Sequence, residues 1–333
     1  MSESFANSNT RGRKAPKAPE LGVGDEIGAG DSHLVADILP TDLADVAFDR
    51  MKEEVGWKTM YHRAGGEVPR LVAVEGDIAE DGSFPIYRHP ADESPPLSQF
   101  SPTVARIRDH VQKVLKHPVN HVLIQHYRSG ADYISEHSDK TIDVVRGSNI
   151  VNVSLGAQRV MTLRLKKDHK LKHSAEGPTS PPNSSPSPQE HTPRTAQKIP
   201  LPRNSMFVMG PETNKQWLHG INHDNRPLSL KSAGETYEGG NRISLTFRHI
   251  GTFLVPDAND PTQMRIYGQG AKGKTRAEAG LVLGSEDEKH EEEVKGMLSA
   301  FGEENQRSDF DWDATYGEGF DVLHFSPKKE SNS

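Results

Sequence analysis

Residues 133–139 read Tyr-Ile-Ser-Glu-His-Ser-Asp, and this stretch carries the chemical pattern around which the chain is organised. His137 and Asp139 are two positions apart, so on an extended strand both side chains point to the same face. An imidazole and a carboxylate on one face are two of the three ligands of a 2-His-1-carboxylate triad, which binds Fe(II) and leaves coordination positions open. The third ligand has to come from elsewhere in the chain.

His219 is the best candidate for that third ligand. It ends the strand-like run Gln216-Trp217-Leu218-His219, just after a strand expected at 206–209, whereas its rival His223 lies in a polar loop. The chain contains 16 histidines, so a single histidine is more often structural than metal-binding. The triad therefore needs support from other parts of the sequence.

The hydrophobic period predicts a mainly β fold with supporting helices. One helix is expected from Thr41, which can cap it, and a second from Ser101-Pro102, where a cap precedes proline at the first helical position. From Asn120 the period changes to two, and this predicts strands at 121–127, 149–155, 160–165, 206–209 and 242–250. Two helices followed by several short strands are typical of a jelly-roll core with helical support.

Residues 242–248, Arg-Ile-Ser-Leu-Thr-Phe-Arg, alternate strictly between polar and apolar side chains. The polar face carries an arginine at each end, Arg242 and Arg248, with Ser244 between them. If this face lines a cavity, the guanidinium groups need anions, and they could converge on a short dicarboxylate. The alternative is an edge strand whose arginines are solvated.

Six residues combine into one pattern: Tyr127, His137, Asp139, His219, Arg242 and Arg248. This combination resembles the AlkB family of Fe(II)/2-oxoglutarate dioxygenases over roughly residues 55–255. The most specific segments are HVLIQHYRSGADYISEHSD at 121–139 and RISLTFRHI at 242–250. The resemblance implies a double-stranded β-helix (jelly-roll) core and a reaction that uses Fe(II), 2-oxoglutarate as co-substrate and molecular oxygen.

The resemblance also implies residue roles. It makes His137, Asp139 and His219 the catalytic, iron-binding residues. The residues that it implies for the co-substrate are Arg242 at the distal carboxylate, Tyr127 as a hydroxyl donor, Arg248 near co-substrate and substrate, and Gln125 and Ser244 where the family commonly has asparagine. Glutamine and serine still form hydrogen bonds, so co-substrate binding is expected with altered geometry.

The substrate is less clearly indicated. Well-known members of the family oxidise N-methyl groups on flipped nucleobases, and residues 69–77 resemble their substrate lid. However, Glu75 occupies a position where repair enzymes typically carry an aromatic residue, and Thr141 one where they carry an acid that reads the base. The net charge of −7 weakens attraction to phosphates.

These departures favour hydroxylation of a C–H bond, typically in a methyl group, of a small organic molecule such as a secondary-metabolite intermediate. The alternative is an AlkB-type oxidative demethylase of N-alkylated nucleobases in DNA or RNA, in which Phe84 or Tyr87 could stack a base. A non-catalytic binding protein on the same fold is disfavoured by the intact triad and both arginines.

Composition predicts four regions: a disordered tail (1–32), a helix and substrate-lid segment (33–100), the dioxygenase core (101–256) with a disordered Pro/Ser-rich insertion (174–202), and a C-terminal extension (257–333). In the extension, Ser285-Glu-Asp-Glu288 predicts a helix start.

The chain has no cysteine, which excludes disulfides and thiolate metal sites. No apolar run reaches ~18 residues and no secretory signal is present, so we expect no membrane partner and an intracellular location, cytoplasmic or nuclear. The sequence leaves the oligomeric state open.

Overall fold

The computed structural model describes residues 18–61, 66–90, 95–168 and 194–323.

The largest sheet forms one wall of the fold. Neighbouring strands of this sheet are antiparallel, except that β5 runs parallel to β3. Its order is β1 (His33–Val35), β11 (Ser205–Met209), β8 (Ile150–Gly156), β13 (Arg242–Arg248), β6 (His121–Tyr127), β3 (Glu67–Gly76) and β2 (Lys58–Tyr61), with β5 (Leu97–Gln99) beside β3.

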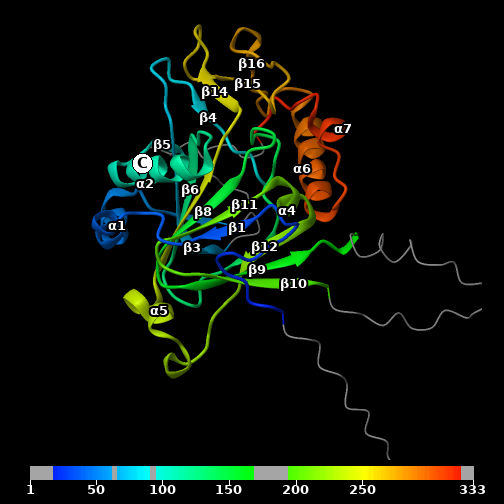
Figure 1. The fold of residues 1–333 in the computed structure, drawn as a ribbon. Coiled ribbons are helices and arrows are strands. Elements are labelled where there is room, and N and C mark those ends of the chain that lie inside the picture. Colours follow the sequence, from blue (N-terminus) through cyan, green and yellow to red (C-terminus); the bar gives the residue numbers. More distant parts are fainter. Residues whose placement is uncertain (1–17, 62–65, 91–94, 169–193, 324–333) are drawn as a thin grey trace, which may run out of the picture.

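A four-stranded sheet faces the large sheet, and the apolar side chains between them form one core (Figure 1). Its strands, in order, are β10 (Ala196–Leu201), β9 (Arg159–Leu165), β12 (Trp217–Ile221) and β7 (Ile134–His137). Phe207 and Ile150 of the large sheet pack with Met161 and Leu163 of the small one. Two facing sheets of short antiparallel strands confirm the expected jelly-roll core.

Helices α1 (Thr41–Glu54) and α2 (Pro102–Leu115) cover the outer face of the large sheet (Figure 1). Alternation on β6 explains this arrangement, because Ile124 packs in the helix-facing core while its neighbours Leu123 and Gln125 line the interior. The predicted Thr41 cap is wrong, since Thr41 is already helical and Pro40 is the N-cap. Ser101 does precede α2, but its hydroxyl donates to Glu75 instead of capping the helix.

The expected strands are present with small shifts at their ends. The strand predicted at 242–250 ends at Arg248, and the carbonyl of His249 instead accepts a hydrogen bond from the backbone N–H of Val145. The shorter helical elements are α4 (Pro211–Gln216), α5 (Ala233–Thr236), η1 (Leu228–Leu230), η2 (Tyr237–Gly240) and η3 (Arg276–Glu278).

Two segments expected to be disordered are partly packed. Within the tail, Ile27 is fully buried and the carboxylate of Asp31 accepts hydrogen bonds from the first backbone N–H groups of α4. Within the insertion, residues 196–201 form β10 at the edge of the small sheet, where prolines are tolerated. Both predictions were wrong for 18–32 and 194–202 because tertiary partners, not local composition, order these residues. Residues 1–17 and 174–193 lie outside the described residues.

The C-terminal extension builds a third sheet and two helices against the core (Figure 1). The predicted cap at Ser285 is wrong, because α6 begins at His290 with Lys289 as N-cap. The third sheet consists of β4 (Phe84–Pro85) from the lid segment, β14 (Thr252–Pro256) from the end of the core, and β15 (Met264–Gly268) and β16 (Gly280–Leu281) from the extension. The two helices are α6 (His290–Gln306) and α7 (Trp312–Tyr316). Among the described residues, no helix has both the length and the apolarity needed to cross a bilayer.

A buried ion pair ties this extension to the lid segment. The side chains of Arg88 and Asp143 are both 0% exposed and lie 2.7 Å apart. Arg88 also donates to the backbone carbonyls of Gly270 and Phe320 in the extension, at 2.8 and 2.7 Å. One guanidinium group therefore joins the lid, the loop after Asp139 and the extension.

Arg88→Met should destabilise the protein by about 3–5 kcal/mol, because it leaves the Asp143 carboxylate buried without a counter-charge. Chemical denaturation measures this change. Arg276→Met is the control, since Arg276 pairs with Asp81 across the sequence but both side chains are about half exposed; it should cost about 1 kcal/mol or less. Equal losses from the two substitutions would contradict a central role for Arg88.

Candidate metal and co-substrate site

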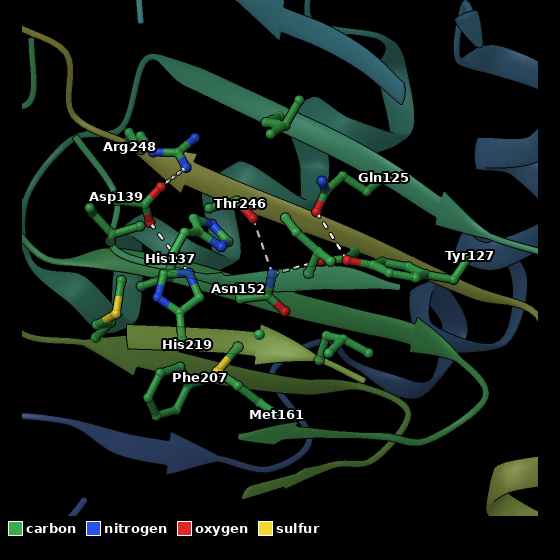
Figure 2. A pocket seen from close by; sticks show the side chains of 18 of the residues that line it. Gln125, Tyr127, His137, Asp139, Asn152, Met161, Phe207, His219, Thr246 and Arg248 are labelled. Carbon is green, nitrogen blue, oxygen red and sulfur yellow. Dashed lines mark hydrogen bonds and ion pairs between the residues drawn. The ribbon is translucent and has the colours of Figure 1, made fainter. Parts of the chain in front are cut away.

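The structure brings His137, Asp139 and His219 together in one cavity (Figure 2). His137 ends β7, and its cross-strand partner on β12 is His219, with ring centroids 4.4 Å apart. Asp139 follows β7, and its Oδ2 lies 4.0 Å from His219 Nε2. His223, the rival considered from the sequence, is exposed and stacks on Tyr133 instead.

The free atoms of these side chains fit a metal ion. His137 Nδ1 lies 2.8 Å from the carbonyl of Ser135, so it donates there and leaves the Nε2 lone pair available. Asp139 Oδ2 is buried and has no hydrogen-bond partner in the part of the chain that the structure describes. Within the described ranges, no group of three such side chains is spaced to hold a metal ion as the side chains stand. Two donors about 2.1 Å from an ion and at a right angle lie about 3.0 Å apart, so the 4.0 Å between His219 Nε2 and Asp139 Oδ2 has to shorten by about 1 Å when an ion binds.

The surroundings of His137, Asp139 and His219 set the protonation states in which these side chains can bind a metal. Burial lowers the pKa of His219 to about 3 and also lowers the pKa of His137. Burial alone would raise the pKa of Asp139, but Arg248 and the two histidines together hold it below its usual range. At neutral pH the site therefore contains two neutral imidazoles and one carboxylate, the forms that metal binding requires.

Three side chains that the sequence did not connect with Asp139 hold it in place. Arg248 pairs with Oδ1, and the Tyr87 hydroxyl donates to the same oxygen at 2.9 Å. Asn214 exchanges two hydrogen bonds of 2.9 Å with the backbone of Asp139. Arg248 was expected near the co-substrate, and the structure adds this contact with a predicted ligand. No local pattern indicates Tyr87 or Asn214 as partners, because they come from distant segments.

Arg242 lies in the interior and not on an edge. Its strand β13 is paired on both sides, with β8 and β6, and Arg242 is 1% exposed, so the alternative of solvated arginines is wrong. Its Nη2 donates to Asn152 Oδ1 and Ser154 Oγ, at 2.9 and 2.8 Å, while Nε and Nη1 have no hydrogen-bond partner among the described residues. Buried guanidinium donors without partners fit a carboxylate ligand.

The remaining predicted co-substrate residues surround Arg242 in the same cavity. The ring of Tyr127 lies 5.2 Å from the guanidinium group, and its hydroxyl donates to Gln125 Oε1 at 3.3 Å (Figure 2). Ser244 accepts a hydrogen bond of 2.6 Å from Asn152. Asn152 was missed from the sequence, although its polar side chain between Val151 and Val153 was a usable signal.

Comparison with known proteins identifies the family. A family model described as the 2OG-Fe(II) oxygenase superfamily matches residues 31–248. The DNA oxidative demethylase ALKBH2 of Homo sapiens is 30% identical over 256 residues, covering 73% of this chain and 85% of that protein. The chain belongs to the AlkB family. ALKBH2 of Arabidopsis thaliana is 26% identical over 257 residues, covering 74% of this chain and 73% of that protein. The solved structure of OsALKBH1 matches with a TM-score of 0.40 and 16% identity, covering 66% of this chain and 98% of that one.

Family membership confirms the predicted chemistry at its coarser level. The chain is an AlkB-like 2OG-Fe(II) oxygenase, an oxidoreductase that uses Fe(II), 2-oxoglutarate and oxygen. The residues present fit these groups, with a triad of two imidazoles and a carboxylate and a buried arginine with free donors. The individual residue roles stay predictions.

Alanine at His137, Asp139 or His219 should abolish Fe(II)-dependent conversion of 2-oxoglutarate to succinate, because each removes one of three metal donors. Succinate is measured by mass spectrometry, and circular dichroism checks the fold. His223→Ala is the control and should keep activity. Activity that survives in the His219 variant but not in the His223 variant would reverse the ligand assignment.

Arg242→Met should raise the 2-oxoglutarate concentration needed for turnover by a factor equivalent to about 2–5 kcal/mol, since a buried carboxylate loses its charged partner. Initial rates over a range of 2-oxoglutarate concentrations measure this shift. Arg164→Met, which removes an arginine paired with Glu136, is the control. An unchanged requirement in a folded Arg242 variant would contradict the predicted role.

Proposed function

We propose that this chain is an oxidative demethylase of N-alkylated nucleobases in nucleic acid, with His137, Asp139 and His219 holding Fe(II). The proposal is carried by similarity to proteins named DNA oxidative demethylase, extending over about three quarters of the chain. It replaces the preference for a small secondary-metabolite substrate, which finds no support among these relatives. The fold accounts for each of the three sequence features that argued against a nucleobase.

Glu75 does not face the substrate side of the sheet. Its cross-strand partner on β6 is Val122, which packs in the core beneath α1 and α2. The Glu75 carboxylate accepts hydrogen bonds from the backbone N–H and the hydroxyl of Ser101, at 2.9 and 3.0 Å. Glu75 thus binds Ser101 at the start of α2. Its presence in place of an aromatic residue is therefore no argument against base stacking in the site.

Thr141 is engaged by the C-terminal extension. Its backbone N–H and hydroxyl both donate to the carboxylate of Glu304 on α6. Glu304 is 3% exposed and also accepts from the Tyr316 hydroxyl at 2.8 Å. An acidic group therefore lies next to the position where the family's acid is expected, but it comes from another part of the chain.

The acidic net charge is confined to the extension. Residues 257–333 hold 17 of the 47 acidic and 9 of the 40 basic residues, a balance of −8, so residues 1–256 carry +1. The dioxygenase core is close to neutral, and the net charge of the whole chain does not argue against phosphate contacts there.

In the proposed reaction, each group of side chains in the site has a separate role. When bound, Fe(II) with 2-oxoglutarate and oxygen supplies the oxidant that hydroxylates a methyl C–H bond; the resulting N-hydroxymethyl group releases formaldehyde and leaves the free base. The triad orients the metal, Arg242 and Tyr127 orient the co-substrate, and the apolar walls Phe207, Met161 and Met209 keep water from the centre. A DNA substrate requires the protein to be in a compartment that contains DNA. The nucleus is one of the two locations expected from the sequence.

Incubation of the wild-type protein with oligonucleotides containing 1-methyladenine or 3-methylcytosine should remove the methyl group and release formaldehyde. Mass spectrometry of the oligonucleotide and a formaldehyde assay measure both products. Asp139→Ala is the inactive control.

Binding of the protein to oligonucleotides should weaken steeply with salt, with a log–log slope of about −0.9 per phosphate neutralised on duplex DNA. Succinate formation without any change in single- or double-stranded oligonucleotides would favour a small-molecule substrate instead.

A further inference from the structure

Tyr87 is a buried tyrosine directly beside the predicted metal ligand. It is 7% exposed, and its ring lies 3.9 Å from the guanidinium carbon of Arg248. Its hydroxyl donates to Asp139 Oδ1 at 2.9 Å and accepts from the backbone N–H of Lys140 at 3.0 Å. The hydroxyl is therefore engaged as both donor and acceptor, and the ring is covered. The sequence-based idea that Tyr87 could stack a base does not fit this position.

The two oxygens of Asp139 have different surroundings. Oδ1 receives hydrogen bonds from Tyr87 and Arg248, so its acceptor positions are occupied by the protein. Oδ2 is buried, has no hydrogen-bond partner within the described ranges, and lies 4.0 Å from His219 Nε2. The carboxylate is thus held so that one oxygen is used internally and the other is left for a cation.

We propose that Tyr87 is a positioning residue that fixes Asp139 as a ligand through Oδ2 alone. The proposal rests on the metal site of the proposed function, but not on the identity of the substrate. Hydrogen-bond partners behind a ligating group set its orientation, and their loss typically costs 10–100-fold in metal affinity. Arg248 supplies the charge at Oδ1, and Tyr87 supplies the directional bond that joins the carboxylate to the Lys140 backbone.

Contacts on both sides along the chain hold Tyr87 in place, with β14 on one side and the C-terminal extension on the other. The preceding residue, Ile86, donates its backbone N–H to the carbonyl of Thr252 at 3.0 Å. The following residue, Arg88, is the fully buried partner of Asp143 and donates to carbonyls at Gly270 and Phe320. Most of these anchors lie beyond residue 248, where the match to the family model ends. The extension thereby supports the ligand geometry without contributing a ligand.

Tyr87→Phe tests the proposal because it keeps the ring against Arg248 and removes only the hydroxyl. Titration of the metal-free protein with Co(II), followed by isothermal calorimetry and visible absorption, measures affinity and ligand geometry. We expect the dissociation constant to rise about 10–100-fold, with a changed Co(II) spectrum and little change in the melting temperature of the metal-free protein.

Tyr316→Phe is the matched control. Tyr316 is also buried, and its hydroxyl donates to the carboxylate of Glu304 at 2.8 Å without contacting Asp139. This variant should leave Co(II) affinity within about 2-fold of the wild type while losing stability of the order expected for one hydrogen bond. Tyr87→His, which retains a ring and a donor, should recover part of the lost affinity and gives a second folded variant.

Unchanged Co(II) affinity and spectrum in a folded Tyr87→Phe protein, no recovery of affinity in a folded Tyr87→His protein, or equal losses in the Tyr87→Phe and Tyr316→Phe variants, would overturn the proposal. These outcomes are separate from failure of the proposed function. Wild-type protein that binds metal but leaves methylated oligonucleotides unchanged contradicts the substrate and leaves the role of Tyr87 intact.

Discussion

Asp139 is a carboxylate inside a β-sandwich, and the rest of the site depends on keeping its charge there. Removing an ion from water costs several kcal/mol unless the protein provides an opposite charge and hydrogen bonds. Arg248 on β13 provides the charge, Tyr87 a hydroxyl bond and Asn214 on α4 two backbone bonds. Three segments far apart in sequence thus converge on one side chain, and the two histidines face the oxygen that these contacts leave free.

The two arginines of strand β13 have different predicted partners, Arg248 a protein side chain and Arg242 a ligand. Arg248 pairs with the Asp139 carboxylate through Nη2, whereas Arg242 donates its Nη2 to the neutral side chains of Asn152 and Ser154. In both arginines Nε and Nη1 are buried without a hydrogen-bond partner among the described residues. Because β13 lies between β8 and β6, neither side chain can reach bulk water by leaving an edge. A strictly alternating central strand therefore carries one predicted anion site, at Arg242, and one support for the predicted metal ligand Asp139, while its apolar face packs beneath the helices.

The C-terminal extension is part of the same structural unit as the core. Its backbone carbonyls bind Arg88, its Glu304 binds Thr141, and its aromatic residues Phe301 and Tyr316 pack with Ile142 of the loop after Asp139. This extension also contains the acidic excess of the chain. The acidity seen in the sequence thus belongs to a supporting layer, and it is a poor guide to what the neutral core binds.

Local spacing was enough to predict much of this protein. The i, i+2 relation of His137 and Asp139, the alternation of residues 242–248 and the apolar stripes of the two helices are properties of neighbouring residues, so the sequence alone determined the jelly-roll class and predicted most of the candidate site. The strand-like run that His219 ends favoured it over His223, and the resemblance to the AlkB family then supplied its predicted role as a ligand. Tertiary structure alone decided the contacts of Tyr87, Asn214 and Glu304, the order of residues 18–32, and the direction of Glu75. The physical reason is that strand pairing and burial are set by partners distant in the chain: Glu75 faces a helix because it pairs with Val122, and nothing near residue 75 encodes that register.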